Sequence, residues 1–162
     1  MLFRSLEFAG TRIPTFDEAL AFAKGKIGIY VDSKRISPAD AIAAIDRHGM
    51  GDKVVIYGGT NYLKEISKQR PTWKVMPEAN SVEHLHELLA AMPLKVVAFD
   101  ANDFKDDVIA VAQGAGVDVY VDRLGPADNE KFWQDAINRG ATGIQTDHPA
   151  ELVIYLKSKG YR

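Results

Sequence analysis

The chain has 162 residues, of which 46% are hydrophobic and 26% charged, and this composition is that of one globular domain able to bury a core. A formal net charge of −2 argues against a nucleic-acid-binding or anionic-membrane-binding protein. Because there is no cysteine, disulfides, zinc–thiolate sites and a thiol nucleophile are all excluded.

No apolar run approaches the roughly 18 residues that a membrane-spanning helix needs. The segment Met1–Arg4 is not a signal peptide, since no apolar stretch of sufficient length follows its charge. We therefore expect a soluble protein, cytoplasmic by default, in which residues 1–162 form a single domain.

A capping box, with Thr15 at the N-cap and Glu18 three residues later, predicts a short first helix, whereas residues 1–12 show no clear period and are predicted as loop. One pattern then recurs along the chain. An apolar, β-branched run ends in a small or acidic residue, and an amphipathic helix follows that closes on Gly or Pro. Ser37-Pro38, for example, provides an N-cap and a first-turn proline. The pattern predicts six strands, at residues 27–31, 53–57, 73–76, 95–99, 117–121 and 142–145.

Six successive βα units imply parallel strands, which can form an open doubly wound sheet or a closed (β/α)₈ barrel. The glycine-rich phosphate turn typical of the doubly wound nucleotide-binding sheets is missing from the sequence. The predicted fold class is therefore α/β, a TIM (β/α)₈-type barrel truncated to about six βα units.

Acidic residues stand at or just after the ends of five predicted strands: Asp32, Glu78, Asp100, Asp122 and Asp147. Strand ends of parallel α/β folds carry the ligand site, and a ring of carboxylates suits a divalent cation such as Mg²⁺ or Ca²⁺. The alternative is that Asp100, Asp122 and Asp147 are helix N-caps and that Glu78 is simply solvated.

Asp32 and Lys34 are two residues apart at a strand end, where alternation directs both side chains to one face. The carboxylate suits a metal ion and the ammonium suits a phosphate oxygen. A surface ion pair is the alternative interpretation.

The four histidines do not form an acid–base pair in the sequence. His48 lies at a helix end, His84 and His86 lie on one helix, and only His148 lies at a predicted strand-to-helix junction. No catalytic base can be assigned from the sequence.

Three segments resemble the glycerophosphodiester phosphodiesterase family. The segment Arg12 to Leu20, R-I-P-T-F-D-E-A-L, is similar to the family's I-P-T-L-E-E-x-L. The segment Ile29 to Lys34, I-Y-V-D-S-K, is similar to a strand ending in Glu-x-Lys. The segment Gly140 to Pro149, G-A-T-G-I-Q-T-D-H-P, is similar to G-A-D-G-I-x-T-D-x-P. The resemblance implies a barrel of this phosphodiesterase type, and it implies Asp32 as a metal ligand and Lys34 as the substrate phosphate contact.

The family's opening His-Arg-Gly strand, Asn-Thr turn, Glu-x-Asp pair and His-Asp are not present in this sequence, so the catalytic residues remain unknown. The resemblance thus implies a domain that is N-terminally incomplete. It also implies hydrolysis of glycerophosphodiesters to an alcohol and glycerol 3-phosphate with Mg²⁺ or Ca²⁺, although we expect this chain alone to be inactive.

The alternative to an enzyme is a non-catalytic, barrel-derived module that binds a phosphate ester or a protein partner. Six units leave open sheet edges, which predict a homo-oligomer unless residues 1–12 fold across the gap.

Overall fold

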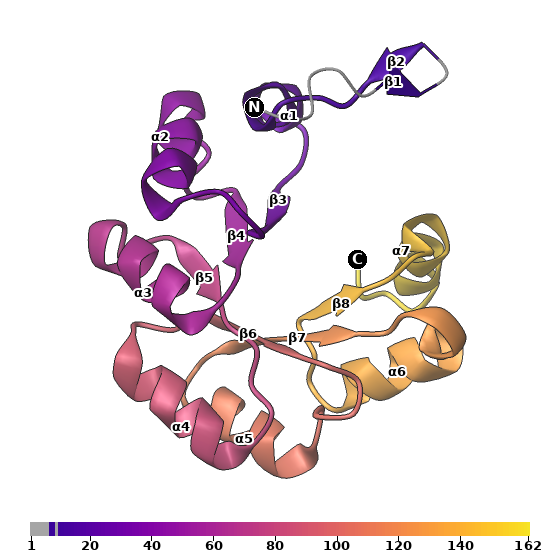
Figure 1. Ribbon diagram of the computed structural model, residues 1–162. Helices are drawn as coiled ribbons and strands as arrows, with labels where there is room; N and C mark the ends of the chain where they lie inside the picture. Colours follow the sequence, from indigo (N-terminus) through magenta and orange to yellow (C-terminus); the bar gives the residue numbers. More distant parts are fainter. Residues whose placement is uncertain (1–6, 9) are drawn as a thin grey trace. The chain divides into compact units, whose positions relative to one another are not determined.

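The computed structural model describes residues 7, 8 and 10–162, and the chain divides into two compact units, Met1–Lys74 and Val75–Arg162. Both units are built from βα repeats, and each contributes to a three-stranded parallel sheet (Figure 1). The fold class predicted from the sequence, an α/β fold matching part of a (β/α)₈ barrel, is confirmed.

Strands β3 and β4 of the first unit belong to a sheet of order β3-β4-β5. Residues Ile29 to Asp32 of β3 pair with residues Val54 to Tyr57 of β4 in parallel register. Helix α1 packs against α2, and α2 packs against α3. The elements are α1 (Phe16–Ala23), β3 (Ile29–Asp32), α2 (Pro38–His48), β4 (Val54–Tyr57), α3 (Thr60–Gln69) and β5 (Lys74–Met76).

Local sequence signals explain where these helices begin and end. The capping box is formed, because the Thr15 hydroxyl accepts from the Glu18 amide and the Glu18 carboxylate accepts from the Thr15 amide. Ser37 caps α2, with Pro38 in the first turn, and Gly49 ends α2 in the left-handed conformation at φ 61°. Both predicted helix starts are confirmed.

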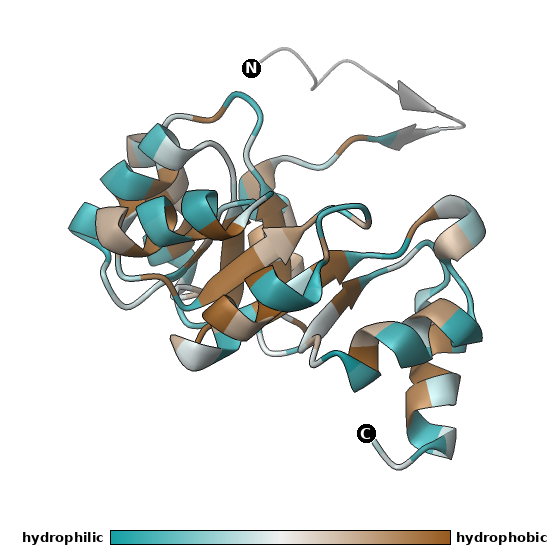
Figure 2. Cartoon of the chain, turned by 90° about the horizontal axis from the view of Figure 1, so that it is seen from below, coloured by the Kyte–Doolittle hydropathy of each residue, from teal (hydrophilic) through white to brown (hydrophobic). Residues whose placement is uncertain are grey.

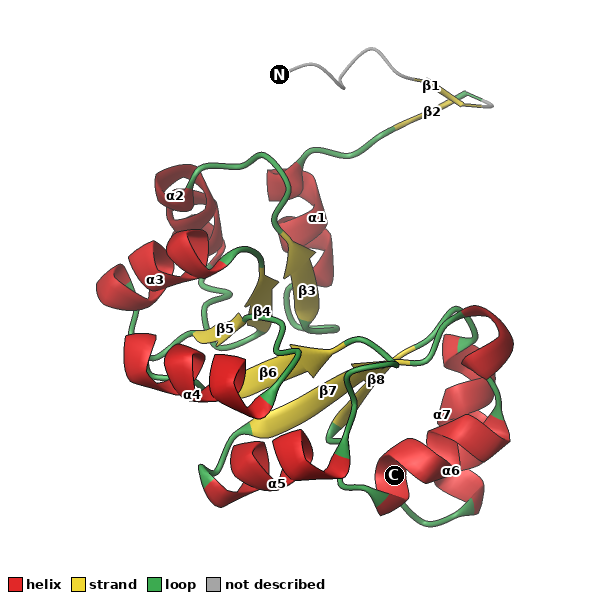
Figure 3. Cartoon of the chain, turned by 60° about the horizontal axis from the view of Figure 1, so that its bottom comes forward, coloured by secondary structure: helices red, strands yellow, loops and turns green. Residues whose placement is uncertain are grey.

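The second unit has a sheet of order β6-β7-β8, in which both pairings are parallel (Figure 3). All four residues of β6 are buried, as expected for a strand covered on both faces. Gly143 of β8 lies against the Tyr120 ring, so closely that a Cβ there would be 2.6 Å from the ring carbons. The elements are α4 (Val82–Ala91), β6 (Val96–Phe99), α5 (Asp106–Gly114), β7 (Asp118–Asp122), the 3₁₀ turn η1 (Gly125–Ala127), α6 (Glu130–Asn138), β8 (Gly143–Gln145) and α7 (Pro149–Ser158).

The hydrophobic side chains are distributed as the periodic patterns predict. The strands of the two three-stranded sheets are mostly apolar, whereas the helices carry both apolar and polar residues (Figure 2). The largest fully buried side chains include Leu20, Ile45, Ile56, Leu63, Leu85, Leu88 and Phe99. No helix in the described part of the chain is both long and apolar enough to span a membrane.

All six predicted strands are present, each within two residues of its predicted bounds. The prediction of loop for residues 1–12 is wrong in part, because β1 (Glu7–Phe8) and β2 (Thr11–Arg12) form a short antiparallel hairpin. A pair of two-residue strands is too short to produce a detectable alternation. The remaining residues of that segment, 1–6 and 9, lie outside the described residues.

The alternative interpretation of Asp100, Asp122 and Asp147 as helix N-caps is wrong. The N-caps of α5, α6 and α7 are Lys105, Asn129 and His148. Long loops separate the first two carboxylates from their helices. Asp100 instead accepts from the Asn102 amide at 3.0 Å and thereby closes a turn.

Candidate functional site

The candidate site of the first unit is formed where β3 ends and the chain turns toward α2. Asp32 is the last residue of β3, and the following amide, that of Ser33, donates to the Tyr57 carbonyl at 3.0 Å. This hydrogen bond extends the pairing of β3 and β4 by one residue. It fixes the start of the loop that carries Lys34 and Arg35.

The structure brings Asp32 and Lys34 together, as the sequence predicts. The Lys34 Nζ lies 2.9 Å from the Asp32 Oδ1, with the two side chains 73% and 44% exposed. The ammonium also lies 5.8 Å from the centroid of the Tyr57 ring, which stacks on Tyr30 at 5.9 Å. The lysine is therefore held by a carboxylate and by an aromatic face, yet remains accessible to solvent.

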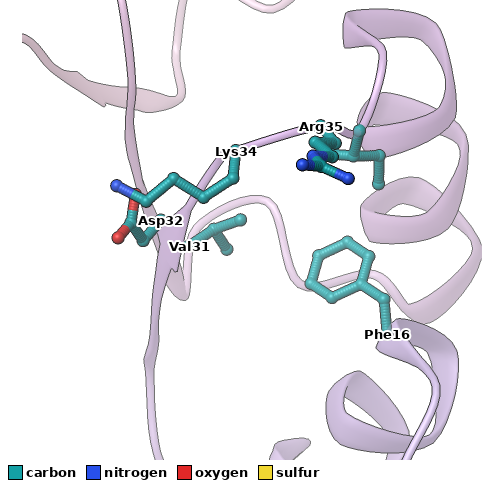
Figure 4. Close-up of a pocket in the computed structure, with 6 residues that line it drawn as sticks. Phe16, Val31, Asp32, Lys34 and Arg35 are labelled. Atoms are coloured by element: carbon teal, nitrogen blue, oxygen red, sulfur yellow. The ribbon is translucent and has the colours of Figure 1, made fainter. Parts of the chain in front are cut away.

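A cavity of about 510 Å³ opens beside this pair. Figure 4 shows the Lys34 ammonium next to the Asp32 carboxylate, with Arg35 and the Phe16 ring of α1 on the other side of the cavity. The lining has three charged residues, Asp32, Lys34 and Arg35. The rest of the lining is apolar and consists of Phe16, Val31 and Ile36. The arrangement can hold an anionic ligand that also carries an apolar group.

The described residues supply only part of the ligand set that a divalent cation needs. Such an ion takes six to eight oxygen ligands when it is Ca²⁺ and about six when it is Mg²⁺. Asp32 supplies one carboxylate, which Lys34 already engages. Among residues 7, 8 and 10–162, no group of three or more acidic or histidine side chains is placed to hold a metal ion.

In the second unit, the charges of two predicted carboxylates, Asp100 and Glu78, act on a third, Asp122. Burial raises the pKa of Asp122, and the negative charges of Asp100 and Glu78 raise that pKa further. Asp122 is therefore repelled by both of these carboxylates when it is ionised.

Asp147 has a structural environment that the sequence did not predict. Its backbone amide donates to the Asp128 Oδ2 at 2.6 Å, while the Thr146 hydroxyl and the Trp133 indole donate to the Asp128 Oδ1 at 2.6 and 2.8 Å. Burial of Asp128 would raise its pKa, but these three hydrogen bonds and the charge of His148 outweigh burial and lower the pKa. Asp128 thus fixes the T-D-H-P turn. Sequence reasoning missed it because it lies in a loop without a periodic or motif signal.

The histidine of the first unit, His48, is not among the residues that line the cavity beside β3. His48 lies at the end of α2 and its Nε2 is 3.0 Å from the Asp17 Oδ1, next to the contact of Arg47 with the same carboxylate. These two contacts, first that of His48 and then that of Arg47, lower the pKa of Asp17. His84 Nδ1 lies 3.1 Å from the Asn80 Oδ1, and His148 is the N-cap residue of α7.

No family model and no curated protein sequence matches the chain. Solved structures do match it. A glycerophosphodiester phosphodiesterase from Parabacteroides distasonis matches with a TM-score of 0.79 and 18% identity, over 98% of this chain and 70% of that protein. A glycerophosphoryl diester phosphodiesterase from the same organism matches with a TM-score of 0.77 and 17% identity, over 93% and 57%.

A glycerophosphodiester phosphodiesterase from Agrobacterium tumefaciens matches with a TM-score of 0.72 and 17% identity, over 85% of this chain and 60% of that one. The chain therefore spans between 57% and 70% of the length of these three structures. The predicted resemblance is confirmed, and the chain shares the fold of the glycerophosphodiester phosphodiesterases over most of its own length.

Proposed function

We propose that this chain binds the phosphate of a glycerophosphodiester at the end of β3, with Lys34 as the phosphate contact, and that by itself it does not hydrolyse the ester. The observation that supports the proposal is the exposed Asp32–Lys34 pair beside a cavity of about 510 Å³, in a fold shared with glycerophosphodiester phosphodiesterases. The enzymatic activity of those proteins is the basis for the choice of ligand.

The exposure of the ion pair makes it a suitable receptor. A solvent-exposed ion pair is worth only about 0–1 kcal/mol, because water screens it. A phosphate group carries more charge density and more acceptor oxygens than the carboxylate, so it can compete with Asp32 for the Lys34 ammonium. In the free chain, Asp32 holds the lysine near the cavity.

We also propose Asp32 as a ligand for Mg²⁺ or Ca²⁺, in keeping with the family resemblance. One exposed carboxylate that is already paired with a lysine provides a weak site, so we expect a dissociation constant of about 1 mM or higher, at or above the weak end of protein calcium sites.

The expectation of inactivity follows from the positions of the histidines. Hydrolysis of a phosphodiester needs a base for the attacking group and an acid for the leaving alcohol, and each step typically contributes about 10²–10⁴-fold. His48 is engaged by Asp17 at 3.0 Å and is not among the residues that line the cavity beside Lys34. In the described part of this unit, no other histidine is available as that acid or base.

The test uses the purified 162-residue chain with glycerophosphocholine, with Mg²⁺, Ca²⁺ or EDTA present, and measures the release of choline. We expect no release above the protein-free background in any condition. Titration with glycerol 3-phosphate, followed by calorimetry, should show binding that Lys34→Gln weakens and Lys64→Gln leaves unchanged. A robust metal-dependent rate that Asp32→Ala abolishes would contradict the proposal of inactivity.

A further inference from the structure

The cavity beside β3 has one positive charge more than it has negative charges. Asp32 and Lys34 neutralise each other at 2.9 Å, and Arg35 is the third charged residue of the lining. Within the described part of the chain, the Arg35 guanidinium makes no hydrogen bond or ion pair. The cavity therefore favours an anion even before Lys34 is released from Asp32.

The position of Arg35 along the chain strengthens this inference. It lies two residues before Ser37, the N-cap of the 11-residue helix α2. The N-terminal end of a helix carries partial positive charge, so an unpaired arginine beside it is unfavourable. Asp40 in the first turn offsets part of that charge, but it is occupied by the Ser37 hydroxyl at 2.7 Å. An anion bound in the cavity would relieve the remaining repulsion.

The shape and the lining indicate which anion fits. The volume of about 510 Å³ is within the usual range of small-molecule sites, about 300–1,000 Å³, and exceeds what a phosphate group alone needs. The uncharged part of the wall is formed by Phe16, Val31 and Ile36. Arg35 and Phe16 lie together on one side, opposite the Asp32–Lys34 pair (Figure 4).

We propose that Arg35 is a second phosphate-binding residue of this site, and that the site selects phosphate esters that carry an apolar group, which packs on Phe16. The planar guanidinium can bind two phosphate oxygens at once, which a lysine cannot do. The inference rests on the proposed function, in which Lys34, once released from Asp32, binds the phosphate from the opposite wall of the cavity. It adds a residue and a substrate class to that function.

The test compares the binding of phenyl phosphate, methyl phosphate and inorganic phosphate by calorimetry. The unmodified chain should bind phenyl phosphate more tightly than the other two. Arg35→Gln should weaken the binding of phenyl phosphate and methyl phosphate by roughly tenfold or more, about the effect of losing one charge-assisted hydrogen bond. Arg35→Lys keeps the positive charge but loses the planar guanidinium. Its affinity for phenyl phosphate should therefore lie between those of the unmodified chain and of Arg35→Gln.

Two further variants separate the two halves of the site. Phe16→Ala should weaken the binding of phenyl phosphate and leave that of methyl phosphate unchanged. Lys64→Gln is the matched control, because it removes one positive charge from an exposed position on α3 outside the cavity lining. Circular dichroism of each variant verifies that it is folded.

The outcomes distinguish this inference from the proposed function. If Lys34→Gln weakens binding and Arg35→Gln does not, the inference is overturned and the proposed function stands. If all three ligands bind equally well, the apolar selectivity is refuted. If none binds to the unmodified chain, both proposals are wrong.

Discussion

The Asp128 side chain stabilises the turn formed by Thr146 and Asp147, a role that the sequence motif of that turn does not reveal. Its two carboxylate oxygens accept three hydrogen bonds, from the Trp133 indole, the Thr146 hydroxyl and the Asp147 amide. These donors come from α6 and from the turn between β8 and α7. The T-D-H-P turn thus has a structural explanation here, in which the backbone amide of Asp147 donates to the Asp128 carboxylate.

Replacement of Asp128 tests this interpretation. Asp128→Asn removes the charge and turns an N–H group toward one of the three donors, so we expect a loss of about 1–3 kcal/mol in the free energy of unfolding at pH 7. Since the folded-state pKa of Asp128 is lowered, its carboxylate stabilises the fold above its ordinary pKa of about 3.9, and this stabilisation is lost as the pH falls through the lowered value.

Urea unfolding at pH 7 and at pH 3 measures the difference in the free energy of unfolding between Asp128→Asn and the unmodified chain. This difference should be smaller at pH 3. Asp52→Asn is the control, because that carboxylate is 72% exposed beside Lys53 and should change stability little. Equal stabilities of Asp128→Asn and the unmodified chain at pH 7 would refute the role of Asp128.

Asp122 has the opposite electrostatic setting. Burial and then the charges of Asp100 and Glu78 raise its pKa, so the folded state binds the proton more tightly than the unfolded state does. Ionisation of Asp122 therefore costs stability as the pH rises from its ordinary pKa through the raised value. We expect Asp122→Asn to increase the free energy of unfolding at pH 7 by about 0.5–2 kcal/mol, with no gain at pH 3. Urea unfolding measures both values, and a variant that is less stable at pH 7 would contradict the prediction.

At the scale of single elements, the features that the sequence predicted correctly are those that depend only on residues close together in the chain. The Thr15–Glu18 capping box, the Ser37-Pro38 helix start and the apolar run of β6 all act within a few positions, and all three are found. Their chemistry is local, so the sequence contains the information needed to recognise them.

Features that depend on loop paths were not predictable in the same way. The N-cap assignments of Asp100 and Asp122 are wrong because several residues separate each strand from its helix, so the caps fall at Lys105 and Asn129. The partnership of Asp128 with Asp147 joins residues 19 apart, and no spacing rule indicates it. The Asp32–Lys34 contact was predictable because both residues belong to one strand end, whereas the apolar wall from Phe16 comes from a different helix.

At the scale of the whole molecule, each three-stranded sheet of the described residues has edge strands, which pair with another strand on one side only. In the sheet β3-β4-β5, strand β3 pairs only with β4, and in the sheet β6-β7-β8, strand β8 pairs only with β7. Large apolar side chains are exposed in the first unit, notably Phe22 of α1 and Ile27, which immediately precedes Gly28 and β3. Strand edges and apolar patches of this kind favour association with another chain.

We therefore predict that the chain forms a homodimer or a higher oligomer through the β3 edge. A charge placed beside that edge should oppose pairing without loss of core packing, since Ile27 is already 68% exposed. Light scattering at tens of micromolar should show an oligomer for the unmodified chain and a shift toward monomer for Ile27→Lys. Ile154→Lys is the matched control, because Ile154 is likewise 68% exposed but lies on α7, and it should leave the oligomer intact. A stable, non-aggregating monomer of the unmodified chain at that concentration would rule out pairing through β3, and the exposed apolar residues would then carry no assembly function.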